Sequence, residues 1–292
     1  LEIEPFVLKL LHLSTVYDEF LQNREGEQAP LDSELKDRLL DFYFQIRSFL
    51  NIYEILDEKY LIYSSYSDSG DFRLRLQCMD PSGNLDTCLN KGISGVFFSA
   101  TLLPVTYYQE QLAGREDDYA VYAPSPFPLS NRLLMVGRDV STRYTRRGPE
   151  EYQKIASYIH QFISALTGNY LIFFPSYRLM EDVASYLEPL IRNDQVQIHT
   201  QNNSMSEEER EAFLSHFENT PKNTTLGLCV LGGIFGEGID LKDSRLIGAV
   251  VVGTGLPMVC LENELFREYF DELKGTGFDY AYLYPGMNKV LQ

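Results

Sequence analysis

The sequence predicts an α/β protein in which a parallel sheet, covered by helices, follows a helical hairpin and a β-hairpin. Three observations support this fold class. Apolar residues repeat at helical spacing within residues 1–60 and alternate with polar ones over residues 72–78. From residue 93 onward, short strand-like runs alternate with helical stripes, the pattern of a sheet layer between helices. We expect two parts, with both hairpins in residues 1–92 and the sheet in residues 93–292.

The helical hairpin is predicted from two apolar seams near the start of the chain. Members of each seam follow one another at alternating intervals of four and three residues, which places them on one side of a helix. The seams comprise Phe6, Leu10, Leu13, Tyr17 and Phe20, and then Leu35, Leu39, Phe42, Ile46, Phe49, Tyr53 and Leu56. A polar stretch with Gly26 and Pro30 separates them, so we expect two antiparallel helices that project from the sheet.

The β-hairpin is predicted over residues 60–66 and 72–78. In the second run apolar side chains alternate with Arg73, Arg75 and Gln77, so one face is expected to be buried and the other exposed to solvent. A turn is expected at residues 80–83, which read Asp-Pro-Ser-Gly.

The sheet is predicted from apolar runs at residues 95–102, 170–177, 196–199, 226–231 and 246–252. The first is expected to be a buried strand that ends in Ser-Ala-Thr, and the last has the Val/Ile-rich composition of a strand buried on both faces. Helical stripes cover residues 155–166, 179–190, 204–217 and 261–273. Ser206 and Glu209 fit a capping box at the start of the third helix.

Composition limits the class of protein. The chain has 292 residues, 44% of them hydrophobic, and lacks an apolar run long enough to span a membrane or a basic signal-peptide start. Its four cysteines, at positions 78, 88, 229 and 260, have no metal-binding spacing. We therefore expect reduced thiols, a cytoplasmic location, no metal site and no membrane partner.

Charge is unevenly distributed. The net charge of -17 argues against a generally basic nucleic-acid binder. Residues 132–147, however, hold five arginines against one acid and include the run Arg-Tyr-Thr-Arg-Arg at residues 143–147. Two interpretations remain open for this run: a phosphate contact with Tyr144 as a stacking face, or a solvated loop ahead of a helix.

A glycine-rich loop follows the apolar run 226–231. Glycines at 232, 233, 236 and 238 flank Glu237 and precede Asp240. Glycines at this density let the backbone turn tightly and approach an anion or nucleotide, while the carboxylates can hold a ribose hydroxyl, an arginine or a metal. Taken alone, such a loop is more often a plain connection than a ligand site.

Four features in a fixed order resemble the second half of superfamily 2 DNA helicases of the DinG/XPD type. They are FFSATL from Phe97, LIFFPSY from Leu171, Gln201 after a strand-like run, and GGIFGEGIDL from Gly232. The three strings look like motifs III, IV and V of that family. The resemblance covers about 200 residues, from Cys78 to the end of the chain.

The resemblance implies a RecA-like second helicase domain, with ATP bound between it and a first domain and single-stranded DNA crossing both. It implies ATP-proximal positions at Gly236, Glu237, Gly238, Asp240 and Gln292. It implies DNA contact, or coupling of DNA grip to nucleotide state, at Ser99, Thr101, Ser176, Tyr177, Gln201, Gly232 and Gly233. For Ser176, an N-cap of the following helix is an alternative.

Two departures from the family pattern predict a fragment. The sequence contains no Gly-x-x-x-x-Gly-Lys-Ser/Thr phosphate loop and no acidic pair at the end of an apolar strand. It also stops at Gln292, where the family continues into its arginine fingers, so the sheet domain is expected to be incomplete at its C-terminus. No catalytic residue is expected within the fragment, which should be inactive alone.

In the intact protein the resemblance implies ATP, Mg²⁺, a first helicase domain on the same polypeptide and 5′-to-3′ movement on single-stranded DNA. An iron–sulfur cluster, where present, belongs to that first domain, and this sequence neither supports nor excludes it. A different class remains open: a non-catalytic α/β adaptor that binds a protein partner through its acidic helical hairpin.

Overall fold

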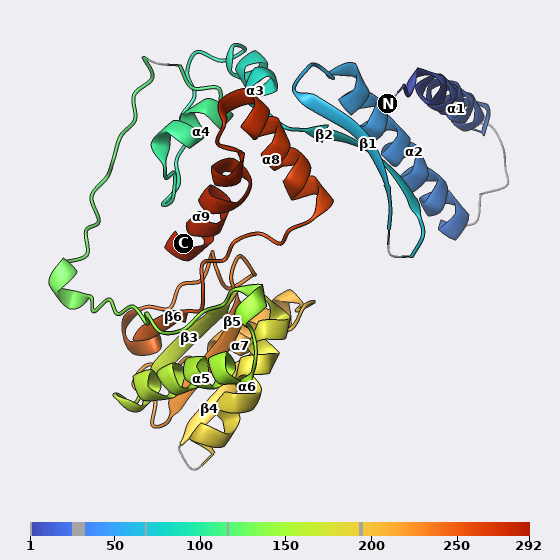
Figure 1. Cartoon of the computed structure of the whole chain (residues 1–292). Coiled ribbons are helices and arrows are strands. Elements are labelled where there is room, and N and C mark those ends of the chain that lie inside the picture. Colours follow the sequence, from blue (N-terminus) through green and yellow to red (C-terminus); the bar gives the residue numbers. More distant parts are fainter. Residues whose placement is uncertain (1, 25–32, 68, 116, 193–194) are drawn as a thin grey trace. The chain divides into compact units, whose positions relative to one another are not determined.

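A computed structural model describes residues 2–24, 33–67, 69–115, 117–192 and 195–292 (Figure 1). The chain divides into two compact units. One comprises Leu1–Phe97 with Val105–Asp118, and the other comprises Phe98–Pro104 with Tyr119–Gln292. The predicted domain boundary between residues 92 and 93 stays a prediction, because compact units are not the same as domains.

The first unit contains the two predicted hairpins. Helices α1 (Glu4–Arg24) and α2 (Ser33–Glu54) are antiparallel, since Phe6 contacts Phe49 while Tyr17 stacks on Tyr43. Strands β1 (Tyr60–Tyr66) and β2 (Phe72–Cys78) pair antiparallel. A small core of Ile3, Val7, Ile46 and Leu50 packs against apolar residues of both strands. The expected linker residues Gly26 and Pro30 lie outside the described residues.

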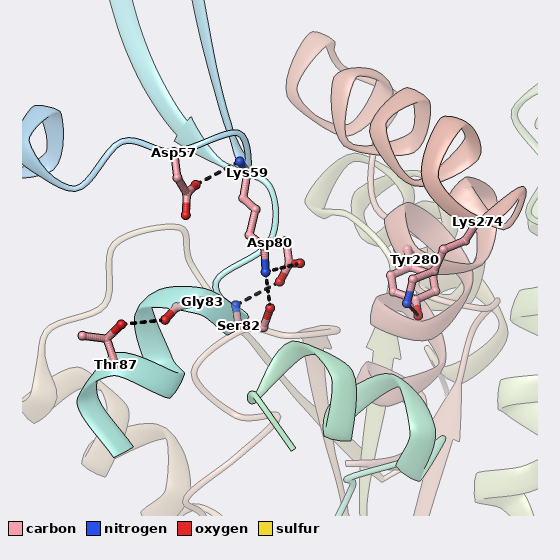
Figure 2. A network of polar contacts seen from close by, with 8 residues as sticks. All are labelled: Asp57, Lys59, Asp80, Ser82, Gly83, Thr87, Lys274 and Tyr280. Carbon is pink, nitrogen blue, oxygen red and sulfur yellow. Dashed lines mark hydrogen bonds and ion pairs between the residues drawn. The ribbon is translucent and has the colours of Figure 1, made fainter. Parts of the chain in front are cut away.

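A polar network closes the open end of the β-hairpin (Figure 2). The Lys59 ammonium donates to the Ser82 hydroxyl at 2.7 Å and forms an ion pair with Asp80 at 3.1 Å. Burial raises the pKa of Asp80, but the hydrogen bonds from Ser82 and Lys59 outweigh it and hold that pKa below its usual value. The last two residues of the predicted turn, Ser82 and Gly83, begin a helix, α3 (Ser82–Leu89).

The second unit is built on a four-stranded parallel sheet in the order β4-β5-β3-β6. Its strands are β3 (Asn169–Phe174), β4 (Val196–Thr200), β5 (Thr224–Val230) and β6 (Gly248–Val251). The predicted α/β class is thus confirmed. Parallel pairing requires a crossover between successive strands, and helices supply the first two crossovers in this sheet (Figure 1).

Helices cover both faces of the sheet. On one face α5 (Pro149–Ser164) and α6 (Tyr177–Ile191) pack on alternate residues of β3, among them Ile172 and Phe174. On the other face α7 (Glu207–Ser215) and the residues after it pack on Leu171. Because successive strand residues point to opposite faces, a continuous apolar run is what a strand between two helical layers needs.

The remaining elements precede and follow the sheet. Helix α4 (Val105–Gln111) and two 3₁₀ turns, η1 (Leu129–Asn131) and η2 (Tyr144–Arg146), come before α5. A further 3₁₀ turn, η3 (Asp243–Arg245), precedes β6. Helix α8 (Leu261–Lys274), a π-helical turn η4 (Asp279–Leu283) and α9 (Tyr284–Leu291) end the chain.

Two strand predictions are corrected by the structure. Residues 95–102 form no strand, and Val96 and Phe98 are exposed. A strand is stabilised by hydrogen bonds to a neighbour, and in the described part of the chain no other strand pairs with these residues. The run 246–252 does contain β6, but β6 lies at a sheet edge with Val251 exposed, so it is not buried on both faces.

Candidate functional site

The candidate site lies at the carboxyl edge of the parallel sheet. Because all four strands run the same way, the residues that follow them meet at this edge. Ser176 and Tyr177 follow β3, Gln201 follows β4, and the glycine-rich loop of residues 232–240 follows β5. Three segments that are distant in sequence are therefore brought to one side of the sheet by its topology.

Gln201 connects these three segments. Its side-chain carbonyl accepts a hydrogen bond from the Val230 amide at 3.0 Å, and its NH₂ group donates to the Tyr177 hydroxyl at 2.9 Å. The Tyr177 hydroxyl in turn donates to the Asn202 carbonyl at 3.2 Å. Gln201 is only 3% exposed, so both ends of its amide are engaged within the protein. This buried amide holds the ends of β4 and β5 and the start of α6 in fixed positions.

Ser176 is the N-cap of α6. Its hydroxyl accepts a hydrogen bond from the Leu179 amide at 3.3 Å, and its backbone is extended, as a helix N-cap requires. The N-cap interpretation of Ser176 is therefore confirmed, whereas its contact with DNA stays a prediction. The capping box of Ser206 and Glu209 at the start of α7 is confirmed as well.

The first two glycines of the loop are set by close contacts. Gly232 has φ of 71°, a left-handed conformation that favours glycine, and the aliphatic part of Lys289 from α9 packs against it. At Gly233 a Cβ atom would lie 2.7 Å from Nε2 of Gln201 and 2.9 Å from the Val230 carbonyl. A larger residue at position 233 would therefore disturb the Gln201 contacts as well as the turn.

The second half of the loop is anchored to α7. Phe235 is buried and stacks on Phe213, with ring centroids 4.2 Å apart. The Arg210 guanidinium donates to the Gly238 carbonyl at 2.9 Å and pairs with Glu207 at 3.0 Å. These contacts hold the loop while its carboxylates remain accessible.

The two carboxylates of the loop face solvent. Glu237 is exposed, and the Asp240 side chain is 70% exposed and pairs with Lys242 at 3.0 Å. An exposed ion pair of this kind contributes little to stability and is easily exchanged for another partner. Asp240 is therefore available to a ribose hydroxyl or an arginine, and its position fits the predicted ATP-proximal role without testing it.

The other predicted positions are not joined to this edge by any hydrogen bond of the described residues. Ser99 and Thr101 contact each other, with the Thr101 amide donating to the Ser99 hydroxyl at 3.2 Å. Gln292 ends the chain, exposed, and its amide donates to the Asn288 carbonyl. The roles assigned to these three residues stay predictions.

Cys229 and His199, near the carboxyl edge, lack the features of an activated nucleophile and its base. Burial raises the pKa of the Cys229 thiol, which keeps it protonated. His199 stacks on His216, and burial, followed by the charge of that neighbour, lowers the pKa of His199. Within the residues that the structure describes, no group of three or more His, Cys, Asp or Glu side chains is placed to hold a metal ion. None of their helices is long and apolar enough to cross a membrane.

Sequence reasoning missed Arg210 and Lys289. Both touch the loop from helices, one through a side-chain hydrogen bond to Gly238 and the other through packing on Gly232. Nothing in the residue pattern of α7 or α9 separates them from ordinary surface cations, since the contact depends on how these helices pack. The arrangement as a whole presents glycine backbone and two exposed carboxylates at one sheet edge, an arrangement suited to a phosphate or a nucleotide sugar.

Comparison with known proteins shows which proteins this arrangement resembles. Residues 159–292, which include the whole sheet and the loop, match the family model of the helicase C-terminal domain. This part of the chain is similar to a helicase C-terminal domain. The match confirms the predicted resemblance to the C-terminal part of a DinG/XPD-type helicase.

Two curated proteins similar to this chain are named as helicases. A probable ATP-dependent helicase of Methanocaldococcus jannaschii is 25% identical over 154 residues, which is 50% of this chain and 22% of that protein. The regulator of telomere elongation helicase 1 homolog of Arabidopsis thaliana is 24% identical over 220 residues, 67% of this chain and 21% of that protein. The chain thus matches about a fifth of the length of each relative.

Solved structures of XPD helicase share the fold. An apo XPD structure superposes with a TM-score of 0.59 at 19% identity, covering 96% of this chain and 53% of that one. A second XPD helicase structure gives a TM-score of 0.56 at 18% identity, with coverage of 91% and 49%. The fold match therefore extends beyond the helicase C-terminal domain to nearly the whole chain.

Proposed function

We propose that the chain is part of an ATP-dependent DNA helicase and supplies its second RecA-like domain. One observation carries this proposal: the segments after β3, β4 and β5 meet at one sheet edge and are tied together there by Gln201. Open α/β sheets bind their ligands at this edge. The helicase names of the relatives support the same activity, whereas the alternative of a non-catalytic adaptor is not favoured by the comparisons.

In this proposal ATP approaches the second half of the glycine loop. Gly236, Glu237, Gly238 and Asp240 would face the ribose, together with Gln292 at the chain end. The exposure of Asp240 and the anchoring of the loop by Arg210 support this role. Bound Mg²⁺ would neutralise charge on the phosphates, and its protein ligands would come from the first helicase domain.

Single-stranded DNA would cross the first half of the same loop. Gly232 and Gly233 would approach the sugar-phosphate backbone, with Ser176 and Tyr177 beside them. Because the Gln201 amide is already engaged at both ends, its contribution would be to hold this track in shape. Ser99 and Thr101 would couple the DNA track to nucleotide state, and movement would run from 5′ to 3′ in the cytoplasm.

A first helicase domain of the same polypeptide would complete the ATP site. Exposed apolar side chains support this partner, because apolar side chains left open to water are often covered by another domain. They lie in residues 93–98 and 119–136 and include Ile93, Val96, Phe98, Val121, Tyr122, Leu133 and Val136. The relatives support it as well, since each extends well beyond the region that this chain matches.

The proposal is tested by Asp240→Ala in the complete helicase. Losing one charged hydrogen bond to the nucleotide should lower DNA-stimulated ATP turnover by about 10- to 100-fold. Affinity for single-stranded DNA should stay within about two-fold, because several segments share that contact. ATP hydrolysis and oligonucleotide binding are measured on the same preparation, with the exposed Glu211→Ala of α7 as the matched control.

Unchanged ATP hydrolysis with a large loss of DNA affinity would show that the two halves of the loop have been assigned the wrong way round. The chain on its own should hydrolyse no ATP, because its sequence encodes neither a phosphate loop nor a metal-holding acidic pair. DNA-stimulated ATP hydrolysis by this chain alone would contradict the proposed division of labour.

A further inference from the structure

An exposed tyrosine stands on a short turn immediately before α5. The turn is η2 (Tyr144–Arg146), and the Tyr144 side chain is 81% exposed. The guanidinium of Arg147 lies 5.8 Å from the centre of the Tyr144 ring. The turn thus presents one open aromatic face with a cation beside it, an arrangement that proteins use to stack unpaired bases.

Three contacts hold this turn in place. The Arg147 Nε donates to the Thr142 carbonyl at 3.1 Å, and Arg146 forms an ion pair with Glu151. The Glu151 carboxylate is buried and also accepts a hydrogen bond from the Ser141 amide at 2.8 Å. This backbone hydrogen bond, more than the ion pair, lowers the pKa of Glu151 and keeps the carboxylate charged. The exposed ring is therefore carried by an ordered turn rather than by a free loop.

The turn lies at the carboxyl edge of the sheet. Thr142 packs so closely on Gly253, just after β6, that a Cβ atom at position 253 would come within 2.5 Å of its hydroxyl. Across this edge the order is Gln201 after β4, the glycine loop after β5, Ser176 after β3 and then Gly253 with Thr142. Neighbouring strands are about 4.8 Å apart, so Gly253 lies about two strand spacings from the glycine loop.

The charge of the turn is favourable for a nucleic-acid strand. Arg143 is exposed, and neither it nor Arg147 forms an ion pair with any acid in the described ranges. On a chain with a net charge of -17, two guanidinium groups without an acidic partner at the ligand-binding edge are a local exception. Phosphates are bound by arginines of this kind, and they contribute the salt-dependent part of affinity.

We propose that Tyr144 is a stacking platform for one base of single-stranded DNA, with Arg143 and Arg147 meeting the adjoining phosphates. This inference rests on the proposed function, because it places the strand at the same sheet edge. It extends the strand path from the glycine loop across β3 to the β6 side. The turn that the sequence left open between a phosphate contact and a solvated loop is thereby assigned to the first.

The platform is tested by fluorescence anisotropy on this chain, with labelled oligo(dT) and an abasic oligonucleotide of equal length. Tyr144→Ala should weaken binding to oligo(dT) on the order of ten-fold, the effect expected for losing one stacked base. It should leave both the affinity for the abasic strand and the salt dependence unchanged. Tyr144→Phe, which keeps the ring, should bind oligo(dT) like the unaltered chain.

Arg143→Gln separates charge from stacking. It should weaken binding of both oligonucleotides alike and reduce the slope of log affinity against log salt concentration by about one. Tyr66→Ala removes another exposed tyrosine, in β1, and is the matched control, expected to leave the affinity for both oligonucleotides unchanged. Circular dichroism checks that each variant folds. Because Tyr144 is exposed, its substitution is not expected to affect folding.

The outcomes distinguish failure of this inference from failure of the proposed function. Binding of oligo(dT) that survives Tyr144→Ala overturns the platform and leaves the proposed function standing. A loss that is equal on the abasic strand overturns stacking as its cause. Failure of the unaltered chain to bind either oligonucleotide overturns both the platform and the proposed DNA contact at this edge.

Discussion

Two regions of this chain have similar composition and different structures. Residues 169–174 form the buried strand β3, while residues 93–98, which are also largely apolar, form no strand and are exposed. Phe174 is 0% exposed and Phe98 is 90% exposed, although each lies in an apolar run followed by a polar or proline-containing turn. The difference lies in what surrounds each run.

Strand β3 has β5 on one side and β6 on the other, and helices on both faces. Its backbone groups are paired with two neighbours, and its side chains are removed from water on each face. Residues 93–98 have no strand beside them among the residues that the structure describes. Apolar patterning therefore predicts that a segment is suited to a sheet, while neighbouring strands decide whether the strand forms.

Hydrogen exchange should show the largest contrast between the two regions. Amides of β3 and β5 open only with much of the unit, whereas those of residues 93–98 are open already. Peptides from the strands should exchange on the order of 10³-fold more slowly, which mass spectrometry measures. Equal protection in residues 93–98 would show that these residues have acquired a strand neighbour in solution.

A matched pair of substitutions measures the same contrast in stability. Phe174→Ala should lower the free energy of unfolding by about 3–5 kcal/mol, because it leaves a cavity in a packed core. Phe98→Ala should change it by less than about 0.5 kcal/mol, because that ring contacts mainly water. Urea unfolding followed by circular dichroism compares the two, and a similar loss in both variants would contradict the burial difference.

Mild acidification, near the pKa of histidine, should have the smallest effect and should act through His199 in the sheet region. Burial and His216 lower the pKa of His199 in the folded protein, and residues 93–136 contain no histidine. Above the unfolded pKa of about 6.5 both states hold a neutral His199 and no penalty arises. Below it the unfolded chain takes up the proton more readily than the folded protein. Stability therefore falls as pH is lowered.

Thermal melting between about pH 7.5 and about pH 5.5 measures this effect. Melting temperature should decrease over this range in the unaltered protein and decrease less in His199→Gln. A steeper decrease in the variant would mean that His199 gains, rather than loses, a favourable interaction on protonation.

Much of the fold follows from residue spacing. The hairpins, the four parallel strands and helices α5 to α8 are predicted because their apolar periodicity matches what each must bury. Ser206 and Glu209 also mark the start of α7 correctly. The strand expected at residues 95–102 and the two-sided burial of β6 are wrong, because both depend on which neighbours are present.

The site is predictable in its parts rather than in its connections. Glycine spacing identifies the loop, and the order of motifs identifies its family, since both are written along the sequence. The contacts of Arg210 with Gly238 and of Lys289 with Gly232 join elements far apart in sequence. Their existence depends on how helices pack, which no local pattern encodes.

The hydrogen bonds around Gln201 have one further consequence. The series begins at the backbone amide of Val230, which can only donate, and ends at the backbone carbonyl of Asn202, which can only accept. Gln201 and Tyr177 between them must therefore each accept from one side and donate to the other. The series has a single polarity, imposed by the main chain at both ends, and its members strengthen one another along it. An ionised glutamate in place of Gln201 would bring two acceptors face to face, because the one hydroxyl hydrogen of Tyr177 is already committed to Asn202.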